Sequence, residues 1–380
     1  MCKIFYTIYK DKWGNSFYTP RPIITTGFFL YINNKNIPFN KCLLTYLEGS
    51  NLDKIRSDGK IEILYQNEKK IIIINNNRRI YENINPHYTC IEILNEDNIK
   101  QFFEIDNNIN LNKDKGIIRL QYFDIKKGKE LSYIYSKIIS IDEYLINYTF
   151  SPKQGSLGSP IISRYSNSKI IGLHSGYYTY EKFSLAVSVY FIINDIINQI
   201  KALDRITKEY KDINQNPISN CGITVGLFKK NDVRNWRVTI LGPRDTSYKG
   251  GLFYLSINFP TDYPSKPPEV CFITPIYHIN VNPEHHFKKL GHISISTLNL
   301  WKPEYTMREV LTNIFSLFYL GNPESSYKLY MAEEFKNNRA LYEEKIKIFT
   351  KKYADPNIDF KMYPKNEDWN FYLYNEFNYR

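Results

Sequence analysis

The sequence predicts two domains, an all-β domain in the first half of the chain and an α+β domain with a four-stranded antiparallel sheet in the second half. The chain has 380 residues, which is more than a single hydrophobic core normally serves. Between residues 26 and 186, short runs of β-branched and aromatic residues alternate with turn-forming residues. After residue 200, helix-like and strand-like patterns follow one another. We therefore place the domains at residues 1–200 and 201–354, followed by an aromatic-rich tail at residues 355–380.

The first half contains several strand candidates, because its apolar runs are short and rich in Ile, Tyr and Phe. The clearest candidates are residues 27–32, 60–65, 70–74, 89–93 and 169–173. Their composition and spacing favour an all-β barrel or sandwich. An apolar helical segment at residues 192–200 closes this domain and can continue directly into the next helix.

Two pairs of phrases in the first half resemble trypsin-like serine peptidases. Gly-Phe-Phe at residues 27–29 is followed by Leu-Leu-Thr at residues 43–45, and Gly-Ser-Leu-Gly-Ser-Pro at residues 155–160 is followed by Ile-Gly-Leu-His at residues 171–174. The resemblance spans about residues 22–200 and implies a trypsin-like double barrel. In that family the glycine-rich loop carries the nucleophile and presents backbone N–H groups to the oxyanion.

The resemblance places the three catalytic positions on residues that cannot perform acyl transfer. The nucleophile position falls on Leu157, the histidine position on Glu48 and the aspartate position on His87. The mechanism needs a hydroxyl, an imidazole that takes its proton and a carboxylate that orients the imidazole. Ser156 and Ser159 flank the loop without occupying its apex. We expect a degenerate, catalytically inactive peptidase domain that serves as a scaffold or a peptide-binding surface.

The second half begins with an amphipathic helix. Leu203, Ile206, Tyr210 and Ile213 recur at steps of three, four and three residues, which is the helical period. Strand patterns follow at residues 222–228, 235–241 and 251–259, separated by glycine- and proline-containing turns. A further helix is predicted at residues 307–318, and one or two charged helices at residues 330–353.

The turns and the segment after them resemble ubiquitin-conjugating enzymes. The glycine and proline pairs that carry the resemblance are Gly242-Pro243, Gly250-Gly251, Phe259-Pro260, Tyr263-Pro264 and Pro267-Pro268. The family's His-Pro-Asn triplet appears as His278-Ile279-Asn280, its Gly-x-Ile-Cys-Leu run appears at residues 291–295, and its Trp-x-Pro appears at residues 301–303. The resemblance covers about residues 201–354 and implies a conjugating-enzyme (UBC) core.

The position of the family's catalytic cysteine is occupied by Ser294. A cysteine thiol has a pKa of about 8.5 that can be tuned lower, so its thiolate is accessible at neutral pH. A serine hydroxyl needs a neighbouring base, and the motif places no histidine or carboxylate to activate Ser294. Asn280 either supports an oxyanion or holds the loop by hydrogen bonds to backbone, and His278 is expected to pack the loop. Ile279 replaces the family proline, and we expect it to relax the loop.

The composition of the chain argues against several classes of partner and cofactor. The net charge is +11, but the sequence has no dense Lys/Arg block and no aromatic RNA-binding signature, so we do not expect nucleic acid as a partner. Five cysteines have no CxxC spacing, and His285 and His286 have no third ligand, so we expect neither a metal ion nor a cofactor. No secretory or membrane-spanning segment is evident, so we expect no membrane partner and a cytoplasmic location, with the nucleus as an alternative.

These features together predict a non-catalytic conjugating-enzyme variant. We expect it to bind ubiquitin or a ubiquitin-like protein, or an active conjugating enzyme, and the peptidase-like domain to act as a scaffold. One alternative is an active enzyme, either an atypical conjugating enzyme or a serine peptidase with another nucleophile. The other alternative is a basic interaction scaffold.

Overall fold

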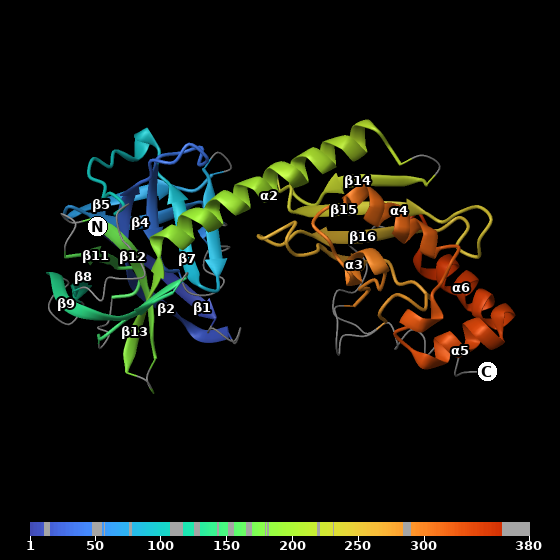
Figure 1. Ribbon diagram of the computed structural model, residues 1–380. Helices are drawn as coiled ribbons and strands as arrows, with labels where there is room; N and C mark the ends of the chain where they lie inside the picture. Colours follow the sequence, from blue (N-terminus) through green and yellow to red (C-terminus); the bar gives the residue numbers. More distant parts are fainter. Residues whose placement is uncertain are drawn as a thin grey trace. The chain divides into compact units, whose positions relative to one another are not determined.

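The structure is a computed structural model of the full chain. It describes residues 1–10, 16–47, 55–56, 58–75, 78–106, 117–124, 130–142, 144–150, 156–164, 169–178, 180, 182–218, 221–230, 232–283 and 290–358. The chain divides into two compact units, Met1–Asn198 and Gln199–Arg380. Figure 1 shows the elements of each unit.

Unit 1 is all-β apart from short helical turns and the start of one long helix. Its strands are β1 (Cys2–Lys10), β2 (Ser16–Tyr31), β3 (Lys41–Thr45), β4 (Lys60–Tyr65), β5 (Glu68–Ile73), β6 (Ile80–Ile84), β7 (His87–Glu92), β8 (Ile117–Asp124), β9 (Glu130–Ile141), β10 (Leu145–Tyr148), β11 (Pro160–Ser163), β12 (Ile170–Tyr178) and β13 (Phe183–Ser188). Each of the five predicted runs overlaps one of these strands. The all-β prediction for the first half is therefore confirmed.

The strands of unit 1 form two groups. Seven of them make a sheet in the order β5-β4-β1-β2-β3-β7-β6, and six make a closed barrel in the order β10-β13-β12-β11-β8-β9. Each group has its own hydrophobic core: Phe29 and Leu43 are buried in the sheet, and Leu120 and Ile146 are buried in the barrel. Closing a sheet into a barrel removes its exposed edges.

The two helical segments predicted around residue 200 form a single helix, α2 (Val189–Gln215). Ala202, Ile206 and Ile213 lie on its buried face, as their spacing indicates. The Tyr210 ring packs edge-on against the Trp236 indole at 5.5 Å between ring centroids. The helix therefore supplies one wall of the core of unit 2.

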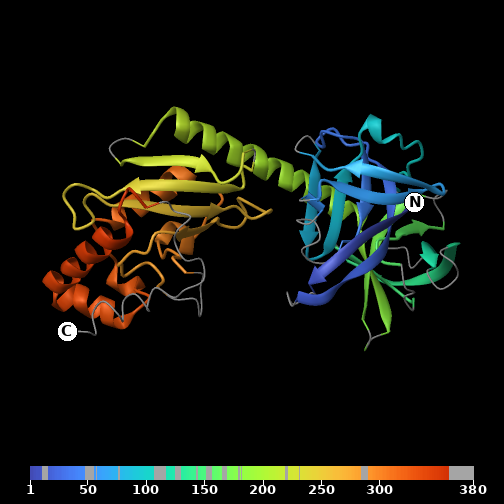
Figure 2. The same cartoon turned by 180° about the vertical axis from the view of Figure 1, so that it is seen from behind.

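Unit 2 contains the predicted four-stranded antiparallel sheet, in the order β14-β15-β16-β17. Its strands are β14 (Ile223–Leu227), β15 (Asn235–Leu241), β16 (Leu252–Asn258) and β17 (Glu269–Phe272). Burial alternates along β15 and β16, so that Trp236, Val238 and Ile240 point into the core. Figure 2 shows the strands of this sheet side by side, seen from behind.

Helices complete unit 2. They are α3 (Ser296–Asn299), α4 (Met307–Leu317), α5 (Leu329–Asn337) and α6 (Arg339–Tyr353), with a 3-10 turn, η2, at Pro323–Ser325. The charged segment at residues 330–353 thus forms two helices, one of the two outcomes predicted. Within the described ranges, no helix is long and apolar enough to cross a membrane. The aromatic residues of the predicted tail, from residue 360 onward, lie outside the described residues.

Candidate functional site

Two isolated bridges hold the segment that contains Ser294. Cys271 at the end of β17 pairs with His292, and Val281 pairs with Ile293, both antiparallel. The Ser294 N–H donates to the Asn280 carbonyl at 2.9 Å. This backbone contact brings the predicted positions 280 and 294 together. Cys271 is 2 % exposed, so its thiol is buried beneath the bridge to His292.

The Ser294 hydroxyl lies in a hollow of about 420 Å³ that has a neutral lining. The Asn299 side-chain amide donates to the Ser294 Oγ at 3.0 Å. The polar lining residues are Ser294, Ser296, Asn299, Asn313, Asn322 and Ser325, and the others are aliphatic. Among these described residues there is no acid, base or cation. A serine hydroxyl needs a base to become a nucleophile, and the lining supplies none.

Asn280 is fully buried, and its side-chain amide is committed to the loop that follows α4. Its Nδ2 donates to the carbonyl of Asn322 at 2.8 Å and to the carbonyl of Ser325 at 3.0 Å. Its Oδ1 accepts from the Asn322 N–H at 2.7 Å. Both amide protons are therefore used within the fold. The geometry corresponds to the loop-holding alternative predicted for Asn280.

His278 is also buried, at 3 % exposure, and both ring nitrogens have backbone partners. Its Nδ1 accepts from the Asn280 N–H at 3.0 Å, so the proton of the neutral ring sits on Nε2, which donates to the Leu317 carbonyl at 3.0 Å. Burial lowers the pKa of His278 to about 4. The ring stays neutral at pH 7, and neither nitrogen is available to Ser294.

Ile279 does not loosen the loop. Its backbone N–H donates to the Tyr342 hydroxyl at 3.0 Å, and its side chain is fully buried. A proline at this position has no N–H and could not make this bond. The Ile279 carbonyl also accepts from the Tyr327 N–H at 3.0 Å. The prediction of a relaxed loop is therefore wrong, because the replacement adds a bond to α6.

A second set of contacts fixes the Trp301 side of the site. The Trp301 indole N–H donates to the Pro264 carbonyl at 2.7 Å. Arg205 on α2 donates through Nη2 to the Tyr305 carbonyl at 2.7 Å. Glu209, one turn later on α2, accepts from the Arg205 Nε at 2.7 Å and from the Tyr263 hydroxyl at 2.9 Å. The loops at residues 260–266 and 301–305 are thus both bound to α2.

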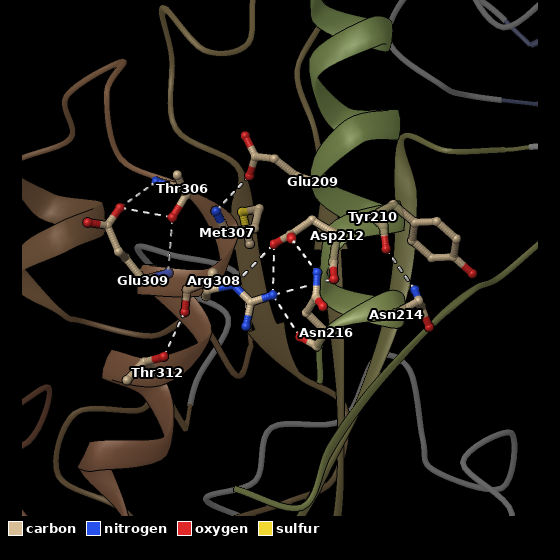
Figure 3. A network of polar contacts seen from close by, with 10 residues as sticks. All are labelled: Glu209, Tyr210, Asp212, Asn214, Asn216, Thr306, Met307, Arg308, Glu309 and Thr312. Carbon is tan, nitrogen blue, oxygen red and sulfur yellow. Dashed lines mark hydrogen bonds and ion pairs between the residues drawn. The ribbon is translucent and has the colours of Figure 1, made fainter. Parts of the chain in front are cut away.

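The same region of α2 also holds the start of α4, as Figure 3 shows. The second oxygen of Glu209 accepts from the Met307 N–H at 2.7 Å, and Arg308 forms an ion pair with Asp212 at 2.7 Å. Thr306 caps α4, and Glu309 bonds back to the Thr306 N–H at 2.7 Å, which completes a capping box. Two orphan donors at the start of the helix are therefore satisfied locally, and a third is satisfied by α2.

In unit 1, the turn that contains Leu157 is pressed against β2. The Leu157 carbonyl accepts from the Thr26 N–H at 3.0 Å and from the Thr25 hydroxyl at 2.8 Å. Gly158 has a φ of +79°, and a Cβ added there would lie 2.0 Å from the Thr26 carbonyl oxygen. Only glycine fits this position. The apex residue of the turn is Leu157, which offers no nucleophile.

The position aligned with the family aspartate, His87, is connected to that turn only through intermediate residues. Thr45 on β3 donates from its hydroxyl to the Thr26 carbonyl at 2.9 Å. The next residue, Tyr46, stacks on the His87 ring at 4.4 Å between centroids, and His87 Nε2 bonds to the Leu47 carbonyl. Contacts therefore link the Leu157 turn through β2 and β3 to His87. Glu48, the position aligned with the family histidine, lies outside the described residues, as does Gly155.

Ser159 and His174 form a buried pair in unit 1 that the triad alignment did not single out. The His174 N–H donates to the Ser159 carbonyl at 2.8 Å, and His174 Nδ1 contacts the Tyr148 hydroxyl at 2.6 Å. The Ser159 hydroxyl and His174 Nε2 have no hydrogen-bond partner among the described residues. Burial lowers the pKa of His174 to about 4. Both residues are 0 % exposed, which keeps any substrate from reaching them.

Several residues of the site are not evident from the sequence. Tyr342 and Asn322 reach the His278–Asn280 segment from distant parts of the chain, and Asn299 reaches Ser294 from α3. None of them belongs to a motif used in the prediction. The two adjacent histidines considered as metal ligands, His285 and His286, lie outside the described residues.

The comparison with protein families agrees with this geometry. Residues 205–350 match the family model described as ubiquitin-conjugating enzyme. The match begins on α2, includes the sheet and the segment that carries Asn280 and Ser294, and ends in the last turn of α6. The second half of this chain therefore contains a UBC-like region.

Proposed function

We propose that the protein acts in a ubiquitin pathway as a non-catalytic conjugating-enzyme variant. On this proposal, unit 2 binds ubiquitin, a ubiquitin-like protein or an active conjugating enzyme without accepting ubiquitin itself. The UBC-like region at residues 205–350 supports the pathway. The serine at the cysteine position supports the absence of thioester chemistry.

The observation that carries the proposal is that the two polar side chains of the family triplet, His278 and Asn280, are already committed. Both amide protons of Asn280 bond to loop carbonyls, and both nitrogens of His278 bond to backbone. Charging of Ser294 would need a base to remove its proton and a donor to stabilise the oxyanion. His278 and Asn280 cannot supply them without breaking the bonds that hold the loop.

For unit 1 we propose a degenerate trypsin-like domain, with the double barrel that this relationship implies, that serves as a scaffold. Leu157 at the apex of the turn and the burial of Ser159 support this assignment. A serine-directed fluorophosphonate probe tests it on the full chain. We expect no labelling, and stoichiometric labelling would show that a nucleophile other than position 157 is active.

The central experiment is ubiquitin charging with activating enzyme and ATP. The wild type should form no thiol-sensitive conjugate. Ser294→Cys should charge partially at best, because Asn280 stays committed to the loop. Ser296→Cys is the matched control, since Ser296 lies in the same hollow but outside the cysteine frame. Robust charging of the wild type would overturn the proposal, and equal charging of the two variants would show that the frame does not matter.

A binding titration distinguishes a domain that binds ubiquitin-pathway proteins from one that binds none of them. Labelled ubiquitin and a panel of conjugating enzymes are titrated against the full chain. We expect saturable binding to at least one of them. The absence of binding at high micromolar concentration to all of them would reject the proposal, whatever the charging assay gives.

A further inference from the structure

A second hollow in unit 2 lies beside the end of α6, away from Ser294. It has a volume of about 350 Å³ and forms between one face of α6 and the turn that precedes β16. The helix contributes Lys347, Thr350 and Lys351, which share a face because they are three and four residues apart. The turn contributes Lys249 and Gly250 from the other side.

The two walls of this hollow are held together by close contacts. The Leu252 N–H donates to the Ala354 carbonyl at 2.7 Å. A Cβ added to Gly251 would lie 2.7 Å from the Thr350 methyl group. Ser247 donates to the Glu343 carboxylate at 3.3 Å. These contacts fix the positions of the two backbone segments that carry the lysines on either side of the hollow.

The hollow is positively charged. In the part of the chain that the structure describes, the ammonium groups of Lys249, Lys347 and Lys351 make no hydrogen bond or close ion pair. Glu343, one turn before Lys347, is an acid outside the lining: it pairs with Arg339 at 2.8 Å, and Lys347 also helps to lower its pKa. Asp355 is the one acidic residue among the described lining residues, and its Oδ1 accepts from both the N–H and the Nδ2 of Asn357 at 2.8 Å. Three lysines and one aspartate leave a net charge of +2 on the lining.

The stability of α6 does not by itself account for the three lysines of the hollow. Lysines in the last turn of a helix are favoured by its dipole. However, Lys347 and Lys351 are a like-charged pair four residues apart, which weakly destabilises a helix, and Lys249 adds a third charge from another segment. Thr350 is 6 % exposed as a residue and lines the hollow, and its hydroxyl has no partner among the described residues. Gly250 is exposed, and its N–H has no partner among the described residues. An anion in the hollow can replace water at these groups and offset the lysine charges.

We infer that this hollow binds a phosphoryl oxyanion. Three ammonium groups, a hydroxyl and a backbone N–H match the several acceptor oxygens and the double charge of a phosphoryl group better than the single charge of a carboxylate. The group is carried either by a free phosphate compound or by a phosphorylated side chain of a partner. This site is independent of Ser294 and of the function proposed for it.

The test is an isothermal titration of the full chain with sodium pyrophosphate at constant ionic strength, with sodium chloride as the reference salt. A second arm uses a short phosphoserine peptide and its unphosphorylated form. The test variant is Lys347→Gln/Lys351→Gln. The control variant is Lys302→Gln/Lys336→Gln, which removes the same charge from exposed lysines outside the hollow.

We expect saturable pyrophosphate binding that weakens by roughly tenfold or more in the test variant and stays unchanged in the control. Binding of the phosphoserine peptide but not of its unphosphorylated form would assign the ligand to a partner protein. Binding of pyrophosphate alone would assign it to a free phosphate compound. If both variants lose pyrophosphate affinity equally, the affinity depends on net charge alone and the inference is overturned. The absence of pyrophosphate binding by the wild type would overturn it as well.

Discussion

The side chain of Asn280 makes three hydrogen bonds that connect the Ser294 segment to the loop between α4 and α5. At the same residue scale, His278 uses both ring nitrogens to bind backbone, and the Ile279 N–H bonds to Tyr342. The three residues aligned with the family triplet therefore act as a structural clamp. Their stability effects can be separated by substitution.

Asn280→Ala should lower the free energy of unfolding by roughly 2–4 kcal/mol, because it removes a fully buried side chain and three hydrogen bonds to the partly buried loop at Asn322 and Ser325. Asn299→Ala is the control, because Asn299 is exposed and its amide bonds only to the Ser294 hydroxyl. Urea unfolding followed by tryptophan fluorescence measures both variants. An Asn280→Ala protein as stable as the wild type would show that the clamp contributes nothing.

The buried imidazole of His278 predicts a dependence of stability on pH. Its pKa falls from 6.5 in the unfolded chain to about 4 in the folded one, so between these values the unfolded state binds more protons. Stability is then full above pH 6.5 and declines as the pH falls toward 4. At pH 5 we expect a loss of about 2 kcal/mol from this residue.

Thermal or urea unfolding at pH 7 and pH 5 checks this dependence, with His278→Asn as the comparison. The variant should be less stable than the wild type at pH 7 and should lose less stability between the two pH values. His174 in unit 1 has the same direction of pKa shift and remains in both proteins, so the difference between them isolates His278. Equal slopes would contradict the assignment.

At the scale of elements, α2 organises unit 2 by holding two loops and the start of α4. Glu209 receives three hydrogen bonds, from the Arg205 Nε, the Tyr263 hydroxyl and the Met307 N–H. Its side chain is 13 % exposed. One turn later, Asp212 pairs with Arg308 in a more exposed position, with side chains 52 % and 35 % exposed. Figure 3 shows Glu209 and Asp212 on successive turns of α2, with dashed lines to Met307 and Arg308 at the start of α4.

Glu209→Gln should destabilise unit 2 by roughly 1–3 kcal/mol, because an amide replaces an oxygen that accepts from a buried donor. Asp212→Asn should have a much smaller effect, because solvent screens the exposed ion pair that it disrupts. Urea midpoints of the two isosteric variants give the comparison. If Asp212→Asn is the more destabilising variant, the exposed Asp212–Arg308 pair contributes more to the attachment of α4 than Glu209 does.

At the scale of the whole molecule, each unit has its own hydrophobic core. The core of unit 2 runs from Ala202 on α2 to Ala354 after α6, and it includes the sheet and the helices of that unit. The sheet and the barrel of unit 1 have separate clusters. A core of this size can support independent folding.

A fragment of residues 189–358, which keeps α2 whole, should therefore fold on its own with a cooperative thermal transition. The full chain should show the same transition together with a second one from unit 1. Differential scanning calorimetry of the fragment and the full chain measures both. A fragment without a cooperative transition would show that unit 1 is required for the fold of unit 2.

The sequence by itself determined most helices and strands of unit 2 and the frame of its site, but not α3 or η2. The period of α2, the strand patterns and the turns with Pro and Gly are local properties, and local pattern is enough to place helices and strands. The replacement of the cysteine by Ser294 is likewise read directly from the frame. For unit 1, the sequence predicted an all-β fold, but strand order and barrel closure depend on pairing between distant segments.

Only the tertiary structure decided what the site residues contact. Asn280 meets Asn322, Ile279 meets Tyr342, and Lys249 faces Lys347, because packing brings together segments that are far apart in the sequence. No periodicity encodes such pairs, since a donor finds its acceptor only after the helices and the sheet have packed. For the same reason, the sequence left the role of Asn280 open between oxyanion support and loop holding, whereas the folded chain shows its amide bonded to the loop.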